Sequence, residues 1–267
     1  MRTPLFKIHP YARSIILNLQ KKIGLFPREF CLITGSPRSG TSALVRWLGK
    51  QKQISAFPES RILVSSHRFL EEARRFQNLE KEIGRIESLA RKLAFDYYID
   101  SRLSLGKRLI VDKEPLEPIA FPLRDYEKFI INVRKIIPRA KILFAIRDPL
   151  ATIWSMSRRT WGESLTEPQR RRFTLDEYIE DWNMCAELVL ENCAAPNVYI
   201  VQFGRLINDP ANESKRIFDF LGIRGGALFE PRETNEINFD NKEREKILTA
   251  VAGQVEKLRI KGIKDLS

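Results

Sequence analysis

The stretch Gly35-Ser36-Pro37-Arg38-Ser39-Gly40-Thr41-Ser42 lies between two segments of different periodicity. Before it, residues 30–34 form a mostly apolar run with the length of a short buried strand. The stretch is therefore predicted to join a strand to a helix N-terminus, where free backbone N–H groups and the helix dipole bind anions. The helix is predicted from apolar residues that recur at helical spacing, namely Ala43, Leu44, Trp47 and Leu48.

The residue types in this loop indicate which phosphate group it suits. The nucleotidase pattern G-x-x-x-x-G-K-[ST] uses a lysine on the β- and γ-phosphates and a hydroxyl on magnesium. Here Thr41 stands at the lysine position, so hydroxyl groups and Arg38 are the side-chain donors. Such a set suits a donor with one phosphate and one sulfate better than a magnesium triphosphate. A glycine turn that binds no ligand is the alternative for this stretch taken alone.

The stretch resembles the 5′-phosphosulfate loop of the sulfotransferases, which commonly reads x-x-P-R-S-G-T-[ST]. The resemblance implies the sulfuryl donor 3′-phosphoadenosine-5′-phosphosulfate (PAPS) and the product adenosine 3′,5′-bisphosphate (PAP). In motif style the chain is similar to bacterial, tyrosyl-protein and carbohydrate sulfotransferases. The resemblance also implies that the donor is bound by Ser36, Pro37, Arg38, Ser39, Gly40, Thr41 and Ser42.

A second stretch extends the resemblance. Residues 141–146 are predicted to form a buried strand that ends in Arg147-Asp148-Pro149, and the proline suits the first turn of a helix. Ser155 follows Arg147 by eight residues and Arg159 follows it by twelve. The family's 3′-phosphate site resembles this arrangement, which implies that Arg147, Ser155 and Arg159 bind the 3′-phosphate of PAPS. The alternative for this stretch alone is a local salt bridge and turn.

A third stretch matches the scaffold of the family more than its chemistry. Residues 198–203 are predicted to form a strand, and the segments that follow are similar to a family pattern near Y-E-D-L-x-x-D-P that ends in F-L-G. Phe203 stands where a tyrosine is usual, so the hydroxyl contact of that tyrosine is absent. Gly204-Arg205 replaces the usual acidic residues. The resemblance covers roughly residues 28–225.

Sulfuryl transfer needs a base for the proton of the acceptor hydroxyl and a cation for the charge on the leaving phosphate. Glu59, in Phe57-Pro58-Glu59-Ser60-Arg61, follows the first helix, where some relatives carry a Glu-x-Arg element with a catalytic glutamate. The resemblance makes Glu59 the predicted base. Arg61 is expected to orient it or to bind the acceptor, and a neighbouring arginine keeps a glutamate ionised. A surface Glu–Arg pair in a loop is the alternative.

The predicted cation is Lys113, which ends the apolar run of residues 109–111 in Asp112-Lys113-Glu114-Pro115. This segment resembles the family's N-K-x-P or K-T-H element, whose lysine contacts the bridging oxygen of the donor. Pro115 stands where cytosolic relatives carry a histidine base, which favours the glutamate-base group and leaves Glu114 as the second candidate base. Of the two histidines, His9 lies near the N-terminus and His67 is expected to be a surface or capping residue.

Strand-like runs at 30–34, 109–111, 141–146 and 198–203 alternate with helical segments. This pattern predicts an α/β fold with a mostly parallel sheet and helices on both faces, and ligands in such folds bind at the carboxyl ends of the strands. Length predicts a single domain over residues 1–267. Its parts are a core of about 28–225, a helical insertion of about 66–104, a further helix at 174–194 and a C-terminal extension of 226–267. The two helical segments are candidate acceptor-pocket walls, and a solvated helical face is the alternative for such charged helices.

The charge and cysteine content set the expected partners and compartment. The net charge is +12, but the charges are evenly mixed, so no nucleic acid is expected. No run reaches the roughly 18 to 20 apolar residues of a membrane span, and the start lacks a signal-peptide core. Three cysteines without metal spacing fit a reducing compartment, so a cytoplasmic protein without a metal is predicted. The basic loop at 161–173 is either a solvated loop or a lid.

Two hypotheses from other functional classes stay open. A P-loop kinase or NTPase that uses ATP shares the glycine-containing loop, but it needs a lysine at Thr41 and a magnesium-binding acid. A noncatalytic nucleotide-binding protein is the other. The Glu-x-Arg element favours a carbohydrate or a peptide tyrosine as the acceptor of a transferase, and the oligomeric state is left open.

Overall fold

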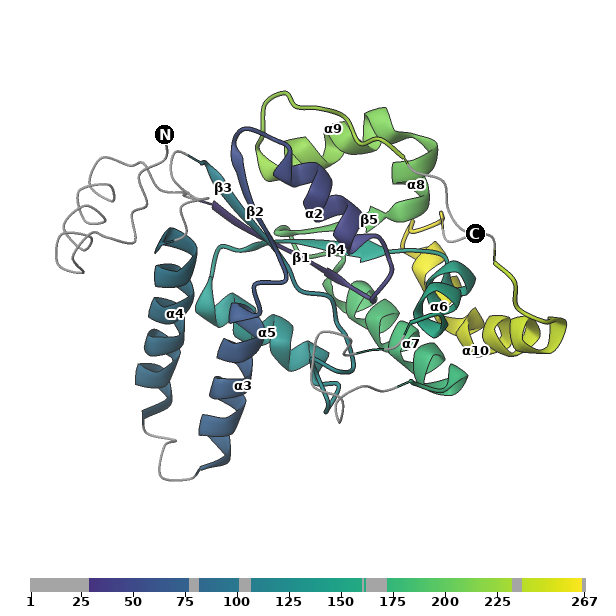
Figure 1. The fold of residues 1–267 in the computed structure, drawn as a ribbon, viewed down its shortest axis with the longest axis horizontal. Coiled ribbons are helices and arrows are strands. Elements are labelled where there is room, and N and C mark those ends of the chain that lie inside the picture. Colours follow the sequence, from purple (N-terminus) through teal and green to yellow (C-terminus); the bar gives the residue numbers. More distant parts are fainter. Residues whose placement is uncertain are drawn as a thin grey trace.

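Five parallel strands in the order β2-β3-β1-β4-β5 form the centre of the computed structural model, as Figure 1 shows. The structure describes residues 29–76, 82–100, 107–159, 161, 172–231 and 237–265. The mostly parallel sheet predicted from the alternating pattern is thereby confirmed. The strands are β1 (Glu29–Gly35), β2 (Ile54–Pro58), β3 (Leu109–Lys113), β4 (Lys141–Ile146) and β5 (Val198–Gln202).

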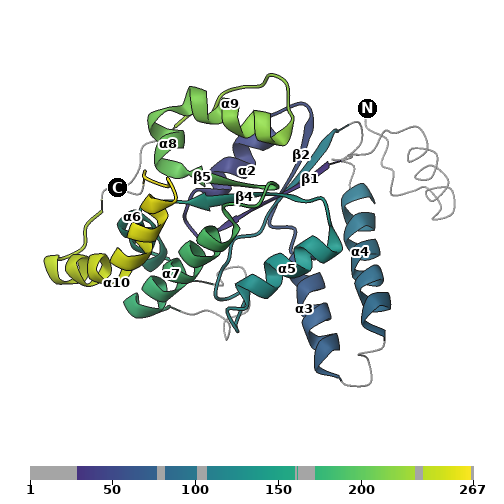
Figure 2. The same cartoon turned by 180° about the vertical axis from the view of Figure 1, so that it is seen from behind.

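Helices cover both faces of the sheet (Figures 1 and 2). One face carries α2, α8 and α9, and the other carries α5 and α7. The pair α3 and α4 extends away from the sheet on the second face, and α10 packs beside α6 and α7. The bounds are α2 (Thr41–Gly49), α3 (Ile62–Arg75), α4 (Ile83–Asp100), α5 (Tyr126–Ile136), α6 (Pro149–Ser157), α7 (Leu175–Asn192), α8 (Phe203–Asn208), α9 (Pro210–Leu221) and α10 (Asn241–Ile260).

Two hydrophobic cores lie on the two faces because successive strand residues point to opposite sides. In β1, Cys31 and Ile33 join the core under α2, α8 and α9. Phe30 and Leu32 join the larger core formed with the helices of the other face. Strands buried on both faces lack polar alternation, which is why β1 and β4 appear in the sequence as continuous apolar runs.

The topology brings three predicted site residues to one edge. β1 lies between β3 and β4, and its own connection runs through α2 to β2 at the far side of β3. Ligands bind in such sheets at the carboxyl ends of the strands, where connections diverge. Gly35 ends β1, Lys113 ends β3, and Arg147 directly follows β4. These residues come together although more than a hundred positions separate the first from the last.

Gly35 also permits the close approach of β1 to β4. Its φ is +133°, and a Cβ atom there would lie 2.2 Å from the carbonyl oxygen of Ala145, its partner in the strand register. No side chain fits at that distance from a backbone atom. At β4, Asp148 caps α6 by accepting a hydrogen bond from the backbone N–H of Ala151, and Pro149 begins the helix as predicted.

Three details differ from the sequence-based expectations. The edge strand β2 was not predicted, because Ile54-Ser55-Ala56-Phe57-Pro58 is short, contains small residues and ends in proline. The strand expected at 198–203 ends at Gln202, since Phe203 begins α8. The insertion expected at 66–104 is a helix pair that begins earlier, at Ile62, and ends at Asp100.

The expectation that His67 is a surface or capping residue is wrong. His67 is 2% exposed and lies within α3. Its Nε2 lies 3.1 Å from Oδ2 of Asp125, and its Nδ1 accepts from the amide of Asn132 at 2.9 Å. Burial lowers the pKa of His67, although Asp125 opposes this shift. His67 therefore joins α3 to α5 through its contacts with Asp125 and Asn132.

Two expectations concern residues that lie largely or wholly outside the part of the chain that the structure describes. His9 lies outside the described residues, and so does the loop expected at 161–173 except for Trp161, Arg172 and Phe173. In the described part of the chain, no helix combines the length and the apolar character needed to cross a bilayer.

Candidate active site

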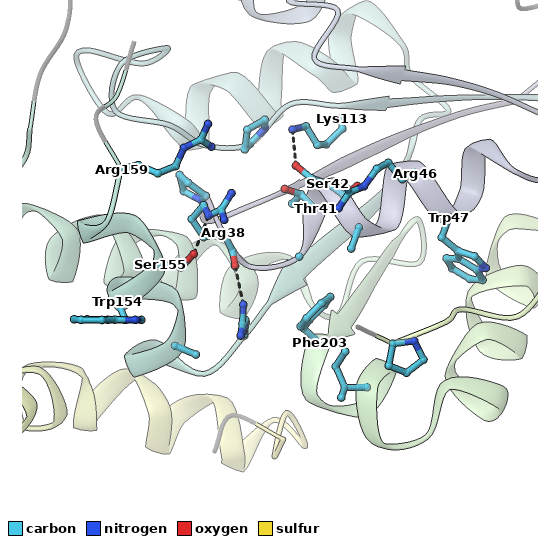
Figure 3. A pocket seen from close by; sticks show the side chains of 18 of the residues that line it. Arg38, Thr41, Ser42, Arg46, Trp47, Lys113, Trp154, Ser155, Arg159 and Phe203 are labelled. Carbon is cyan, nitrogen blue, oxygen red and sulfur yellow. Dashed lines mark hydrogen bonds between the residues drawn. The ribbon is translucent and has the colours of Figure 1, made fainter. Parts of the chain in front are cut away.

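A cleft of about 680 Å³ opens at the carboxyl edge of the sheet. Residues 35–42 are here called the glycine loop, and its members that line the floor of the cleft, together with the first turns of α2, are Pro37, Arg38, Gly40, Thr41 and Ser42 (Figure 3). The end of β3, the helix α6 and the start of α8 supply the walls. Among the described residues, none from α3, α4 or α7 lines this cleft, so a role of the 66–104 and 174–194 helices as acceptor-pocket walls stays a prediction.

The glycine loop directs a helix N-terminus into the cleft. Gly40 is the N-cap of α2, with φ at +100° and no side chain that caps the helix. A Cβ atom on Gly40 would lie 2.2 Å from the ring of Phe203, so only glycine fits. The backbone N–H groups and the positive end of the α2 dipole are therefore available to an anion.

Side chains of the glycine loop divide into two sets. Those of Pro37, Arg38, Thr41 and Ser42 line the cleft. Ser36 and Ser39 are instead buried beneath the loop. The hydroxyl of Ser39 donates to the carbonyl oxygen of Ser36 at 2.6 Å, which stabilises the turn. These two serines were predicted to bind the donor, and their side chains contribute to the shape of the loop.

The predicted 3′-phosphate residues meet the glycine loop at one end of the cleft. Nε of Arg38 donates to Oγ of Ser155 at 2.9 Å, and Nη1 of Arg147 donates to the carbonyl oxygen of Arg38 at 3.5 Å (Figure 3). Arg159 lines the same end, with its guanidinium 6.0 Å from the ring centre of Trp161. Burial, and then the neighbouring arginines, lower the pKa of Arg38. This repulsion marks a site that favours a multiply charged anion.

Phe203 stands where relatives usually carry a tyrosine, and it supplies an aromatic ring without a hydroxyl group. Its ring contacts Gly40 and lies 5.4 Å from the guanidinium of Arg147. At this distance the ring face attracts the cation. Phe203 therefore orients Arg147 at the edge of the cleft without a hydroxyl group.

Lys113 and Glu59 lie together beside the glycine loop. The side chain of Lys113 is 4% exposed, and its Nζ donates to Oγ of Ser42 at 3.1 Å (Figure 3). The same Nζ forms an ion pair with Oε1 of Glu59, whose other oxygen accepts from Nη2 of Arg61 at 2.8 Å. Glu59 and Lys113 line the cleft, whereas Arg61 lies behind Glu59 and is not among the lining residues.

Glu114, the second candidate base, is fully buried and is not among the residues that line the cleft. Burial, and then the charge of Asp112, raise the pKa of Glu114 well above its usual range. Its carboxyl group contacts Arg61. Glu59 is thus the better placed of the two carboxylates for a molecule in the cleft.

A model of the sulfotransferase family matches residues 31–225 of this chain. The chain belongs to the sulfotransferase family. Sulfotransferases are transferases, and the matched region contains the glycine loop, Glu59, Lys113 and the 147–159 segment. The resemblance inferred from the motifs is thereby confirmed.

Two curated relatives match most of this sulfotransferase. The nodulation protein NoeE of Sinorhizobium fredii is 26% identical over 232 residues, which cover 77% of this chain and 53% of the relative. The protein-tyrosine sulfotransferase A of Caenorhabditis elegans is 23% identical over 208 residues, covering 73% and 50%. The chain therefore spans about half the length of the curated relatives that it matches.

Solved sulfotransferase structures share the fold. The sulfotransferase from Alicyclobacillus acidocaldarius superposes with a TM-score of 0.56 at 19% identity, over 88% of this chain and 94% of that one. Sulfotransferase STF9 from Mycobacterium avium gives 0.53 at 12% identity, over 91% and 80%. At these identities the likeness concerns the P-loop-like fold alone.

Several residues of the sulfotransferase cleft were not predicted. Arg46 lies one helical turn after Ser42, and its Nε donates to the carbonyl oxygen of that serine at 3.1 Å. Arg46 lies four residues after Ser42 and therefore on the same face of α2, and this spacing is the sequence signal that could have placed it in the cleft. Trp154 and Glu117 also line the cleft. No motif marks Glu117, which reaches the cleft only because the chain turns after Pro115.

Proposed function

We propose that this sulfotransferase moves a sulfuryl group from PAPS to a hydroxyl group of an acceptor, on a carbohydrate or a peptide tyrosine. The observation that carries the proposal is the position of Lys113, which contacts Ser42 of the glycine loop on one side and Glu59 on the other. A cation thus lies between an anion site and a carboxylate, within one cleft. These are the groups that in-line sulfuryl transfer requires.

Two anion sites in the cleft suit the two charged ends of PAPS. The backbone of the glycine loop, Thr41 and Ser42 form the site proposed for the 5′-phosphosulfate. Arg38, Arg147, Ser155 and Arg159 form the site proposed for the 3′-phosphate, with arginine forks that match a phosphate group. Both sites lie in the same cleft, and the residues that line it include more arginines and lysines than acids.

The chemistry follows from the placement of Glu59 and Lys113. The acceptor oxygen forms a bond to sulfur while the bond from sulfur to the 5′-phosphate oxygen breaks. Glu59 takes the proton of the acceptor hydroxyl, because its carboxylate lies at the cleft surface. Lys113 and the N–H groups of the loop stabilise the charge that develops on the departing phosphate, and PAP is the product.

The acceptor remains to be found by a screen guided by the relatives. The name of the nematode relative states that it acts on protein tyrosine, and the chain shares 23% identity with it. A panel of tyrosine peptides and of mono- and oligosaccharides therefore tests the two proposed acceptor classes. PAP release from PAPS, with and without each acceptor, is the measurement.

Calorimetric titration with PAP tests the donor directly. We expect tight binding that is the same with and without magnesium, and weaker binding of ADP and ATP. Arg147→Ala should weaken PAP binding about 10-fold to 100-fold, since a charge-assisted contact to phosphate is lost. The matched control is Arg75→Ala, an exposed arginine of α3 that pairs with Glu72. A preference for magnesium-ATP contradicts the proposal and favours a kinase or NTPase.

A further inference from the structure

The turn at residues 59–61 has an unusual backbone. Glu59 has φ at +66° and Arg61 has φ at +61°, both in the left-handed region that favours glycine. Such a conformation costs a non-glycine residue on the order of 1 kcal/mol. Two such residues in three positions need neighbouring groups that hold them, and the 59–61 turn carries the proposed base.

Carboxylates from the end of β3 hold the middle of the 59–61 turn. Successive residues of β3 point to opposite sides, so Lys113 faces the cleft while Asp112 and Glu114 lie behind it. Asp112 is fully buried and accepts hydrogen bonds from the backbone N–H of Ser60 at 3.3 Å, from the Ser60 hydroxyl and from the hydroxyl of Tyr98.

Arg61 is held by three carboxylates. Oε1 of Glu114 accepts from the backbone N–H of Arg61, and Oε2 of Glu114 lies 3.4 Å from Nη1. Nη2 of Arg61 donates to Glu117 at 3.0 Å and to Glu59 at 2.8 Å. Burial lowers the pKa of Arg61, but Glu117 and Glu114 raise it overall, so the guanidinium stays charged. Glu59 is thus held by Arg61, and Arg61 is itself held by Glu114 and Glu117.

Opposite charges are concentrated in this cluster. Four carboxyl groups, those of Glu59, Asp112, Glu114 and Glu117, meet the two cations Arg61 and Lys113. Burial raises the pKa of Glu114 well above its usual range and also raises those of Asp112 and Glu117. Both oxygens of Asp112 and both oxygens of Glu114 accept hydrogen bonds. Glu114 therefore holds Arg61 through two contacts, one to its backbone and one to its guanidinium.

We propose that Glu114 is a positioning residue for sulfuryl transfer: its carboxyl group fixes the backbone and the guanidinium of Arg61, and Arg61 in turn holds Glu59 beside Lys113. The inference rests on the proposed function, since it assigns Glu114 a role toward the proposed base. Glu114 is fully buried and acts only through Arg61. A glutamine at this position keeps an accepting oxygen for the Arg61 N–H, whereas an alanine leaves that N–H without its partner.

The test compares Glu114→Ala with Glu114→Gln. PAP release from PAPS, with water as the acceptor, is measured against pH, and PAP affinity is measured by calorimetry. Glu114→Ala should lower the rate about 10-fold or more, with PAP affinity within about threefold of wild type. Glu114→Gln should stay within about threefold of wild type in both. The matched control is Glu213→Ala, which removes another buried glutamate, bonded to Tyr199 at 2.9 Å in α9.

The pH profile separates positioning from a general loss of stability. Lys113 and Arg61 are the cations at Glu59, and Glu114 and Glu117 are the carboxyl groups behind it. Loosening Arg61 in Glu114→Ala should move the acid limb of the profile to higher pH, because a cation that favours the ionised base moves away. Glu213→Ala should be less stable to urea with an unchanged profile. A Glu114→Gln variant as slow as Glu114→Ala overturns the role of the hydrogen bond that Glu114 accepts from the Arg61 N–H.

Nuclear magnetic resonance of the arginine side chains tests the inference without substrate. We expect separate Nη signals for Arg61, assigned with Arg61→Lys, in wild type and Glu114→Gln, because hydrogen bonds restrict guanidinium rotation. These signals should average in Glu114→Ala. Averaged signals in wild type overturn the positioning role. Failure of wild type to bind PAP overturns the donor proposal instead, and the two failures are therefore distinguishable.

Discussion

The glycine loop and the 59–61 turn meet through Lys113, which contacts Ser42 and Glu59, and they use left-handed backbone in different ways. In the glycine loop, Gly35 and Gly40 take positive φ where a Cβ atom would meet Ala145 or Phe203 at 2.2 Å. In the turn, Glu59 and Arg61 take positive φ although both carry long side chains. At Gly35 and Gly40 the loop depends on missing side chains, although Arg38 between them also has φ at +69° and bonds to Ser155. The turn depends throughout on hydrogen bonds that Asp112, Glu114 and Glu117 accept. A backbone site therefore has a short sequence motif, whereas a side-chain site is distributed along the chain.

The largest effect is expected where the two regions meet, at the ion pair of Lys113 and Glu59. Lys113→Met should lower PAPS turnover about 10³-fold, because the charge on the leaving phosphate loses its cation. Glu59→Gln should lower it about 10²-fold or more through loss of the base. Both should retain PAP binding, which depends on the glycine loop and the arginines.

Exposed residues of the same types are the controls for this pair. Lys107→Met removes a lysine that donates to the carbonyl oxygen of Lys52, and Glu72→Gln removes the partner of Arg75. Neither should change turnover. If Lys113→Met or Glu59→Gln keeps wild-type turnover, the proposed chemistry at the boundary between the loop and the turn is wrong.

A smaller effect, on stability, is expected within the glycine loop. Gly35→Ala should lower the free energy of unfolding by about 3 kcal/mol, because the new Cβ atom meets a backbone oxygen and the strands must separate. Gly225→Ala is the matched control, since Gly225 has φ at +66° with no atom within 4 Å of the new Cβ. It should cost only about 1 kcal/mol of conformational strain. Equal losses in urea unfolding would show that the close approach to β4 is unimportant.

The smallest effect is expected from pH, through the helix that follows the 59–61 turn. Burial lowers the pKa of His67 in α3 below its value of 6.5 in model compounds, and Asp125 opposes the shift. The unfolded chain therefore binds a proton more readily than the folded one. The contribution of His67 to stability is fully present above the unfolded pKa and is lost as pH falls toward the folded pKa.

The comparison with His67→Gln isolates this contribution. Urea unfolding of wild type and variant is measured at several pH values around the unfolded pKa of histidine. The wild type should lose more stability on acidification than the variant, which lacks the titrating ring. Glu71, Asp125 and Arg74 face position 67 in both proteins, so the difference reports the histidine together with its effect on the pKa of Glu71. Parallel pH dependences would contradict a buried neutral histidine between α3 and α5.

Predictions from sequence succeeded where one segment encodes its own structure. The continuous apolar run at 141–146 became β4 with the same bounds, and Asp148-Pro149 capped and began α6 as expected. The edge strand β2 was missed because an edge strand needs little apolar alternation and is defined by its partner β3. The burial of His67 was missed for a similar reason, since Asp125 and Asn132 lie about 60 residues away.

The family, the parallel α/β fold and the glycine loop could be predicted from the chain, because each depends on contiguous residues whose backbone geometry admits few alternatives. The packing of Phe203 on Gly40 and Arg147, the inward turn of Ser36 and Ser39, and the place of Arg61 among three carboxylates emerge only in the folded protein. Such contacts join segments tens of residues apart. Their geometry depends on strand register and burial, which have no local signature in the chain.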